Sequence, residues 1–269
     1  MIPITGHTRL TALLGSPVAH SISPLMHNEA FQLLDLDYTY LCFEVNEETL
    51  PAAVDGLKAC GIRGFNLTMP NKNKIVELLD ELSPAARLIG AVNTVVNDDG
   101  HLTGYNTDGV GYMQAVKDAG YDITGKTITI MGAGGAATAI CAQAALDGVE
   151  KIHIFARETS RFWDRTQKLA ENINSTLPCK AVLHENKDTA ALAQAISESA
   201  LLLNATSVGM APNTEGTIIE DTSLYHPDLI VSDVIYNPRE TRFLKEAREA
   251  GCRTFNGMYK LLYQGAEAF

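Results

Sequence analysis

Long hydrophobic runs are missing from this 269-residue sequence: no apolar stretch approaches the ~18 to 20 residues that span a bilayer. The first ten residues, MIPITGHTRL, also lack the basic segment followed by an apolar one that marks a secretory signal. We therefore expect a cytoplasmic protein with no membrane partner.

Cysteine and histidine are present, but not in the spacings that bind metals or form disulfide frameworks. The seven histidines show neither H-x-x-x-H nor H-E-x-x-H spacing, so we predict no metal site. The five cysteines are odd in number and include no C-x-x-C pair. We interpret them as reduced thiols of the core: Cys42, Cys60, Cys141, Cys179 and Cys252.

Positive charge is in deficit, with 21 Lys and Arg against 32 Asp and Glu and a net charge of −11. A field of that sign repels polyanions, so we expect neither nucleic acid nor an anionic membrane as a partner. Hydrophobic residues make up 46% and charged residues 20%, as in ordinary globular proteins. The length allows about two domains with cores of their own.

Apolar and β-branched runs alternate with segments of helical period along almost the whole chain, which predicts an α/β fold. In the first third we predict helices at Ser23-Pro24, with Ser23 as the N-cap, at Leu50, and directly after Pro70. Asp98-Asp99-Gly100 predicts a hairpin turn. The expected strands here are residues 10–14, 38–45, 64–68, 93–96 and 102–105.

A second unit is expected after a helix over residues 108–119. Its first strand, 127–131, runs into a glycine-rich turn and an apolar helix, as a Rossmann-type doubly wound nucleotide-binding domain requires. The further expected strands are residues 151–155, 181–183, 201–205, 229–234 and 253–255.

The glycine-rich turn has the pattern Gly132-x-Gly134-x-x-Ala137. Glycines there let backbone N–H groups at a helix N-terminus approach a pyrophosphate; a tight turn without a ligand is the alternative. We interpret the turn as a dinucleotide site. Its predicted cofactor-binding residues are Gly132, Ala133, Gly134, Gly135 and Ala136.

The loop after the next strand, residues 156–161, should face the adenosine ribose. Arg157 and Arg161 can pair with the 2′-phosphate of NADP, whereas Glu158 favours the 2′-hydroxyl of NAD. Two attractions outweigh one repulsion that solvent screens, so we expect both cofactors to be used with a modest preference for NADP. A solvated charged turn is the alternative.

Four polar motifs in the first 109 residues stand at predicted strand ends. Each residue has a structural alternative: Ser23 as a helix cap, Asn93 as a turn residue and Lys72 as a solvated amine. Lys72 is expected in the first turn of a helix, where the helix dipole disfavours a cation. Asp108 is expected at a helix start, where an anion is favoured and an N-cap is the alternative. The motifs are Ser21–Pro24, Asn66–Lys72, Ala91–Thr94 and Gly104–Gly109.

At these motifs the sequence resembles the shikimate dehydrogenase family, and more closely its quinate/shikimate dehydrogenase branch. The resemblance runs from Leu13 to Phe269. It also includes N-D-D-G at Asn97–Gly100, G-A-G-G-A at Gly132–Ala136 and Q-G-A at Gln264–Ala266.

The resemblance implies an enzyme of chorismate and aromatic amino-acid biosynthesis that interconverts shikimate and 3-dehydroshikimate with NADP or NAD. It implies that Lys72 and Asp108 flank the reacting C3 oxygen, and which of them is the base stays open. Gly257 joins the predicted cofactor-binding residues. The implied substrate-binding residues are Ser21, Ser23, Tyr40, Thr68, Asn93, Tyr236 and Gln264.

We expect a substrate-binding domain over residues 1–107, joined by a C-terminal helix over 258–269, and a nucleotide-binding domain over 108–257. Residues 156–161 depart from the family's usual Asn-Arg-Thr-x-x-Arg, which leaves the preference between NADP and NAD open. Two alternatives remain: a quinate-preferring dehydrogenase, and a noncatalytic ligand-sensing relative, against which Lys72 and Asp108 argue. The family's last helix usually extends further, so truncation is left open, as is a homodimer.

Overall fold

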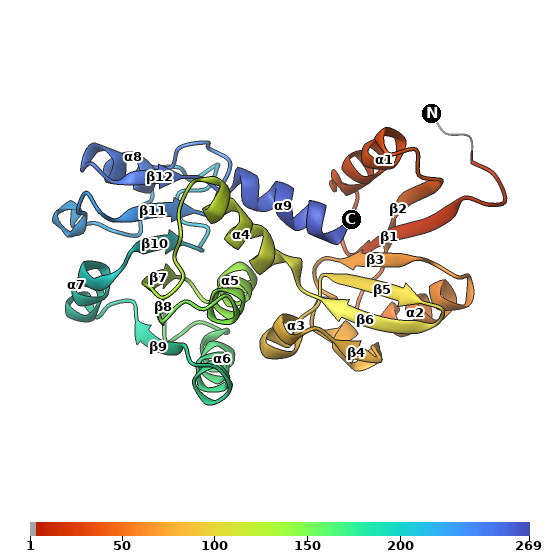
Figure 1. Ribbon diagram of the computed structural model, residues 1–269, viewed down its shortest axis with the longest axis horizontal. Coiled ribbons are helices and arrows are strands. Elements are labelled where there is room, and N and C mark those ends of the chain that lie inside the picture. Colours follow the sequence, from red (N-terminus) through yellow and green to blue (C-terminus); the bar gives the residue numbers. More distant parts are fainter. Residues whose placement is uncertain (1–3) are drawn as a thin grey trace. The chain divides into compact units, whose positions relative to one another are not determined.

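The computed structural model describes residues 4–269, which form two compact units (Figure 1). Unit 1 reaches Thr107 and includes Gly265–Phe269, and unit 2 is Asp108–Gln264. Within the described residues each unit contains one six-stranded sheet with helices, so the predicted α/β class is confirmed. No helix in this part of the chain is long and apolar enough to cross a membrane.

Unit 1 is built on a mixed sheet with the strand order β2-β1-β3-β5-β6-β4. Strand β1 pairs in parallel with β2 and β3, whereas β5 pairs antiparallel with β3 and β6. The elements are β1 (Arg9–Gly15), α1 (Ser23–Leu33), β2 (Tyr38–Glu44), α2 (Leu50–Ala59), β3 (Gly64–Leu67), η1 (Lys74–Leu78), β4 (Glu81–Leu82), α3 (Pro84–Ile89), β5 (Thr94–Asp98) and β6 (His101–Tyr105).

The β5–β6 hairpin follows from its turn residues. Asp99 and Gly100 have φ of 51° and 94°, the two left-handed positions that a two-residue hairpin loop needs. The Asn97 side chain accepts a hydrogen bond from the Gly100 amide at 2.8 Å. The predicted hairpin is confirmed.

Two local predictions in unit 1 are wrong. Helix α1 begins at Ser23 itself with Ile22 as the capping position, so Ser23 is not the N-cap. After Pro70 the chain makes a turn and then only a short 3₁₀ helix, η1, which Lys72 precedes. The dipole argument therefore does not apply to Lys72. The helix ends because Leu79 becomes extended and Asp80 donates its amide to Leu102 of β6 at 3.0 Å.

Unit 2 has an all-parallel sheet. From β9 its order is β9-β8-β7-β10-β11-β12, the 3-2-1-4-5-6 order of a Rossmann sheet, which confirms the predicted class. The elements are α4 (Thr107–Asp118), β7 (Thr127–Met131), α5 (Gly135–Leu146), β8 (Lys151–Ala156), α6 (Trp163–Thr176), β9 (Lys180–Glu185), α7 (Thr189–Glu198), β10 (Leu201–Asn204), η2 (Thr222–Leu224), β11 (Ile230–Asp233), α8 (Arg242–Glu249), β12 (Arg253–Phe255) and α9 (Met258–Ala268).

The central strands of unit 2 are buried on both faces, which is why they read as continuous apolar runs. Leu201–Leu203 of β10 are fully buried, and so are Ile128 and Ile130 of β7. Helix α5 is rich in alanine and buried along most of its length, so its backbone can pack closely.

The last helix, α9, belongs to unit 2 as far as Gln264 and to unit 1 from Gly265. In unit 1 the Phe269 ring lies 5.1 Å from the ring of Phe31 and 6.0 Å from that of His27, between centroids.

All five cysteines are free thiols, but not all are core residues. Cys141, Cys179 and Cys252 are buried as predicted. Cys42 is only half-buried and Cys60 is exposed, because Cys60 follows the last turn of α2 at the surface. The core prediction is therefore wrong for these two.

Candidate nucleotide and substrate sites

A cavity of about 960 Å³ opens in unit 2 at the carboxyl ends of β7, β8 and β10. The strand order reverses between β7 and β10, and ligands of doubly wound sheets bind at such a switch point. The volume suits a small-molecule cofactor. Its lining includes Gly132, Ala133, Gly134, Arg157, Arg161, Asn186, Thr206, Ser207 and Thr217.

The glycine turn leaves the N-terminus of α5 open to this cavity. Gly132 has φ of +124°, and a Cβ there would lie 2.8 Å from the carbonyl oxygen of Ala205, so the fold itself requires glycine. Gly134 has an ordinary φ of −74° and no heavy atom within 4 Å of a built Cβ. Gly135 is equally open, and Ala136 follows it in the first turn of α5. An open backbone at a helix N-terminus is typical of sites that bind a pyrophosphate.

The loop after β8 places two cations on the cavity wall. Arg157 and Arg161 line the cavity, and the Arg161 guanidinium lies 4.7 Å from the centroid of the Phe162 ring. Glu158 is not among the lining residues; its backbone amide donates to the Glu185 carboxylate at 2.5 Å. The loop therefore presents its positive groups to the cavity.

A buried network that the sequence analysis missed supports the opposite wall. Asn204 accepts from the Thr206 hydroxyl at 2.7 Å and donates to the Asp233 carboxylate at 3.1 Å. Asp233 also accepts from the Thr241 hydroxyl at 2.8 Å. Burial raises the pKa of Asp233 to about 6; the hydrogen bonds lower the pKa, but by less than burial raises it. The sequence feature that could have predicted this network is the polar residue that ends each of two apolar strands, Asn204 in β10 and Asp233 in β11.

A second chain of hydrogen bonds crosses the sheet of unit 1. The Tyr40 hydroxyl donates to Asn66 Oδ1 at 2.8 Å, and Asn66 Nδ2 donates to the Thr94 hydroxyl at 3.0 Å. Thr94 in turn donates to Asn93 Oδ1 at 3.1 Å. Tyr40 and Asn93, both predicted substrate residues, are thus joined through Asn66 and Thr94, which lie in the predicted motifs but were given no role of their own.

Ser21 and Ser23 lie close to this chain. The Ser21 hydroxyl accepts from the Ser23 amide at 3.2 Å. Burial raises the pKa of the Tyr40 phenol, and a hydrogen bond with Ser23 opposes that shift. Thr68 follows the end of β3, where Gly15 makes room for it: a Cβ at Gly15 would lie 2.2 Å from Thr68 Cγ2. Unit 1 therefore brings Ser21, Ser23 and Tyr40 together.

Lys72 stands in the turn after β3. Its carbonyl accepts from the Val92 amide at 2.8 Å, and the neighbouring Asn71 side chain, fully buried, donates to the Val45 carbonyl at 2.8 Å. Hydrogen bonds at Lys72 and at the preceding residue therefore fix the backbone of this turn, although Lys72 lies outside any regular helix.

Asp108 is the second residue of α4, not its cap. The first amide of the helix, that of Thr107, donates to the Asn93 side chain at 2.9 Å. Asp108 Oδ1 accepts from Lys260 Nζ of α9 at 2.8 Å, and only 14% and 15% of the two side chains are exposed. Lys260 was missed; its position one helical turn before Gln264 was the available signal.

The remaining predicted residues lie in unit 2. Tyr236 follows β11 and is 46% exposed. Gln264 packs against α4, where a Cβ at Gly111 would lie 2.5 Å from its backbone nitrogen. Gly257 packs on the backbone of Val234, whose carbonyl oxygen leaves no room for a Cβ, and it is not among the residues that line the cavity.

A parallel Rossmann sheet with an open glycine turn at its switch point defines a dinucleotide-binding domain, combined here with a second α/β unit. The family model for the shikimate dehydrogenase substrate binding domain matches residues 13–95. Over 266 residues the sequence is 55% identical to shikimate dehydrogenase (NADP(+)) of Listeria monocytogenes serotype 4b (strain F2365), covering 99% of this chain and 91% of that protein.

Quinate/shikimate dehydrogenase of Escherichia coli (strain SMS-3-5 / SECEC) is 45% identical, covering 99% of this chain and 92% of its own. The crystal structure of shikimate 5-dehydrogenase from Listeria monocytogenes, in complex with shikimate and NAD, matches with a TM-score of 0.96 and 55% identity, covering 98% of this chain and 91% of that one. The chain belongs to the shikimate dehydrogenase family of oxidoreductases, and the predicted resemblance is confirmed.

Proposed function

We propose that this chain catalyses the reversible NAD(P)-dependent reduction of 3-dehydroshikimate to shikimate, a step of aromatic amino-acid biosynthesis. The observation that carries the proposal is the cavity at the switch point of unit 2, with its open glycine turn, in a chain 55% identical over 266 residues to an NADP-dependent shikimate dehydrogenase.

The residues of the cavity fit a dinucleotide. The bare backbone at Gly134, which lines the cavity, and at the adjoining Gly135 suits the pyrophosphate. Arg157 and Arg161 suit the phosphate of the adenosine ribose. A bound nicotinamide supplies the acceptor or donor of the hydride. The protein binds and orients the reactants.

Shikimate carries a carboxylate and ring hydroxyls, and the proposed residues are matched to those groups. Serine, threonine and tyrosine hydroxyls can donate to the carboxylate, and the amides of Asn93 and Gln264 can both donate and accept. We assign substrate binding to Ser21, Ser23, Tyr40, Thr68, Asn93, Tyr236 and Gln264. The hydrogen bonds of Asn93 to Thr94 and Thr107 fix its amide in one orientation.

Oxidation of a secondary alcohol removes the hydroxyl proton as hydride leaves the carbon. We assign this proton to Lys72 of unit 1 and Asp108 of unit 2, because an amine and a carboxylate can exchange it. Either of the two can serve as the base.

Quinate is the second candidate substrate, because the Escherichia coli relative named for both substrates is 45% identical. One experiment tests both: oxidation of shikimate and of quinate is followed with NADP and with NAD. We expect shikimate oxidation with NADP. A folded, nucleotide-binding protein that oxidised neither substrate would contradict the proposal and favour a noncatalytic relative.

A further inference from the structure

We propose that Lys260 is a positioning residue for Asp108: its ammonium group fixes one carboxylate oxygen so that the other is directed to the reacting hydroxyl. This inference rests on the proposed function, in which Asp108 takes part in proton transfer.

The contact between the two residues is short and largely shielded from water. Lys260 Nζ lies 2.8 Å from Asp108 Oδ1, with both side chains about 15% exposed. In the same unit, the ion pair of Arg248 with Glu240 has the same length but side chains that are 53% and 46% exposed. An exposed pair contributes little, whereas a shielded charge-assisted hydrogen bond holds its partners in a defined geometry.

Lys260 occupies a helix position that ordinarily disfavours its charge. It is the third residue of α9, so the positive end of the helix dipole opposes an ammonium group there. Partial burial adds to the cost. The carboxylate of Asp108, which lies in the first turn of α4, compensates for both effects. The ion pair therefore stabilises a lysine at a position where, without Asp108, a neutral side chain would have the lower free energy.

Lys260 also shares a helix face with a proposed substrate residue. Residues four apart lie one above the other on a helix, so Lys260 and Gln264 project from the same side of α9. Close packing at Gly111 fixes α9 against α4 at Gln264. The first two turns of α9 thus carry both the partner of Asp108 and a substrate-binding amide.

The test compares Lys260→Met, which keeps length and loses charge, with Lys260→Arg, which keeps the charge. Small misplacement of a reacting group can cost on the order of 10²-fold in rate, so we expect Lys260→Met to lower kcat for shikimate by roughly 10- to 100-fold. KM and nucleotide affinity should change by less than about threefold, because the substrate-binding residues remain. Lys260→Arg should restore most of the loss.

Two control variants separate positioning from general effects. Arg248→Met removes one positive charge and one exposed ion pair from the same unit. Tyr263→Phe removes the hydrogen bond of Tyr263 to Asp118, another contact between α9 and α4. Both controls should keep wild-type kcat. A Lys260→Met variant within twofold of wild type, or an equal loss in both controls, would overturn the proposal.

A double-mutant cycle with Asp108→Asn locates the effect. If Lys260 acts through Asp108, adding Lys260→Met to Asp108→Asn lowers kcat little further; an undiminished loss shows an independent role and contradicts the proposal.

The ion pair itself is detected by NMR without turnover. The signal of ¹³C-methylated Lys260 is compared between the wild type and Asp108→Asn, and we expect it to shift when the carboxylate is removed. An inactive wild type contradicts the proposed function, whereas an unchanged NMR signal in an active enzyme contradicts the role of Lys260.

Discussion

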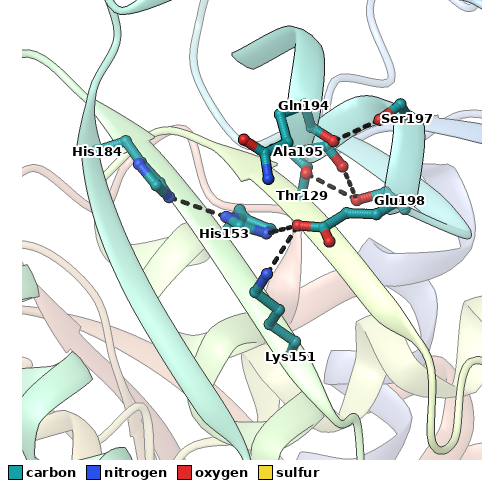
Figure 2. Close-up of polar contacts among 9 residues, drawn as sticks. Thr129, Lys151, His153, His184, Gln194, Ala195, Ser197 and Glu198 are labelled. Atoms are coloured by element: carbon teal, nitrogen blue, oxygen red, sulfur yellow. Dashed lines mark hydrogen bonds and ion pairs between the residues drawn. The ribbon is translucent and has the colours of Figure 1, made fainter. Parts of the chain in front are cut away.

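His153 Nδ1 and His184 Nε2 lie 2.8 Å apart, side by side on β8 and β9 (Figure 2). The other ring nitrogen of His153 lies 2.5 Å from Glu198 Oε1, which also accepts from Lys151 at 2.8 Å. Burial lowers the pKa of both histidines, and the charge of His153 lowers that of His184 further. The folded protein therefore favours neutral imidazoles in this cluster.

We predict that stability falls as the pH drops below the ordinary histidine pKa of 6.5. In that range His153 and His184 bind more protons in the unfolded chain than in the folded one, so they lower the free energy of unfolding as the pH falls. His27 acts in the same direction, because burial lowers its pKa to about 4. Asp233, whose pKa burial raises to about 6, acts in the opposite direction but is a single group. Urea unfolding at pH 7.5 and 5.5 measures the effect. His184→Gln should show a shallower pH dependence but not a flat one; an unchanged slope would contradict this origin.

Lys72→Ala and Asp108→Ala should each lower kcat with shikimate by a factor on the order of 10² or more, as expected for the loss of a proton-transfer group. Nucleotide binding should survive in both. Lys74→Ala is the matched control, because Lys74 forms an exposed ion pair with Glu77 at 2.7 Å. Near wild-type kcat in either variant would reassign that residue to substrate positioning.

Gly134→Val should abolish nucleotide binding without unfolding the protein. The added side chain meets no protein atom within 4 Å of its Cβ, so it fills only the space proposed for the pyrophosphate. Calorimetry should still detect shikimate binding. Gly132→Ala is the contrasting variant: at φ of +124° it should cost about 1–3 kcal/mol of stability and lower the Tm. Retained nucleotide affinity in Gly134→Val would mean that the nucleotide binds elsewhere.

We expect cofactor choice to depend on three residues of the loop after β8: Arg157, Glu158 and Arg161. We predict that the protein uses both cofactors with a modest preference for NADP, and that Glu158→Thr strengthens it. Arg157→Ala and Arg161→Ala should each reduce kcat/KM with NADP more than with NAD, since a charge-assisted contact contributes about 1.5–3 kcal/mol. The ratio of kcat/KM values at constant ionic strength measures the preference. A tenfold preference for NAD that Glu158→Thr leaves unchanged would show that these residues do not face the ribose.

Elements with strong local signals were predictable from the sequence. The strands 127–131 and 253–255 have the predicted bounds, and the Asp99-Gly100 turn forms where its residues require it. The glycine turn lies at the head of α5, as its position between a strand and a helix indicated. In each case the side chains that decide the conformation are neighbours along the chain.

The wrong predictions are those in which distant pairing overrides a local preference. Residues 74–78 have helical spacing, yet the chain extends at Leu79 because it pairs with β6. Serine is a common N-cap residue, but Ser23 is the first residue of the helix itself, and its hydroxyl forms a hydrogen bond with Tyr40.

The amino-acid sequence by itself determined the α/β class, the Rossmann turn and the family, because these depend on short-range periodicity and on motifs of adjacent residues. Only the tertiary structure decided that Asn66 joins Tyr40 to Thr94 and that Lys260 pairs with Asp108 across 152 positions of sequence. Such contacts arise when helices and strands pack, and their geometry depends on the whole fold rather than on the spacing of the two residues.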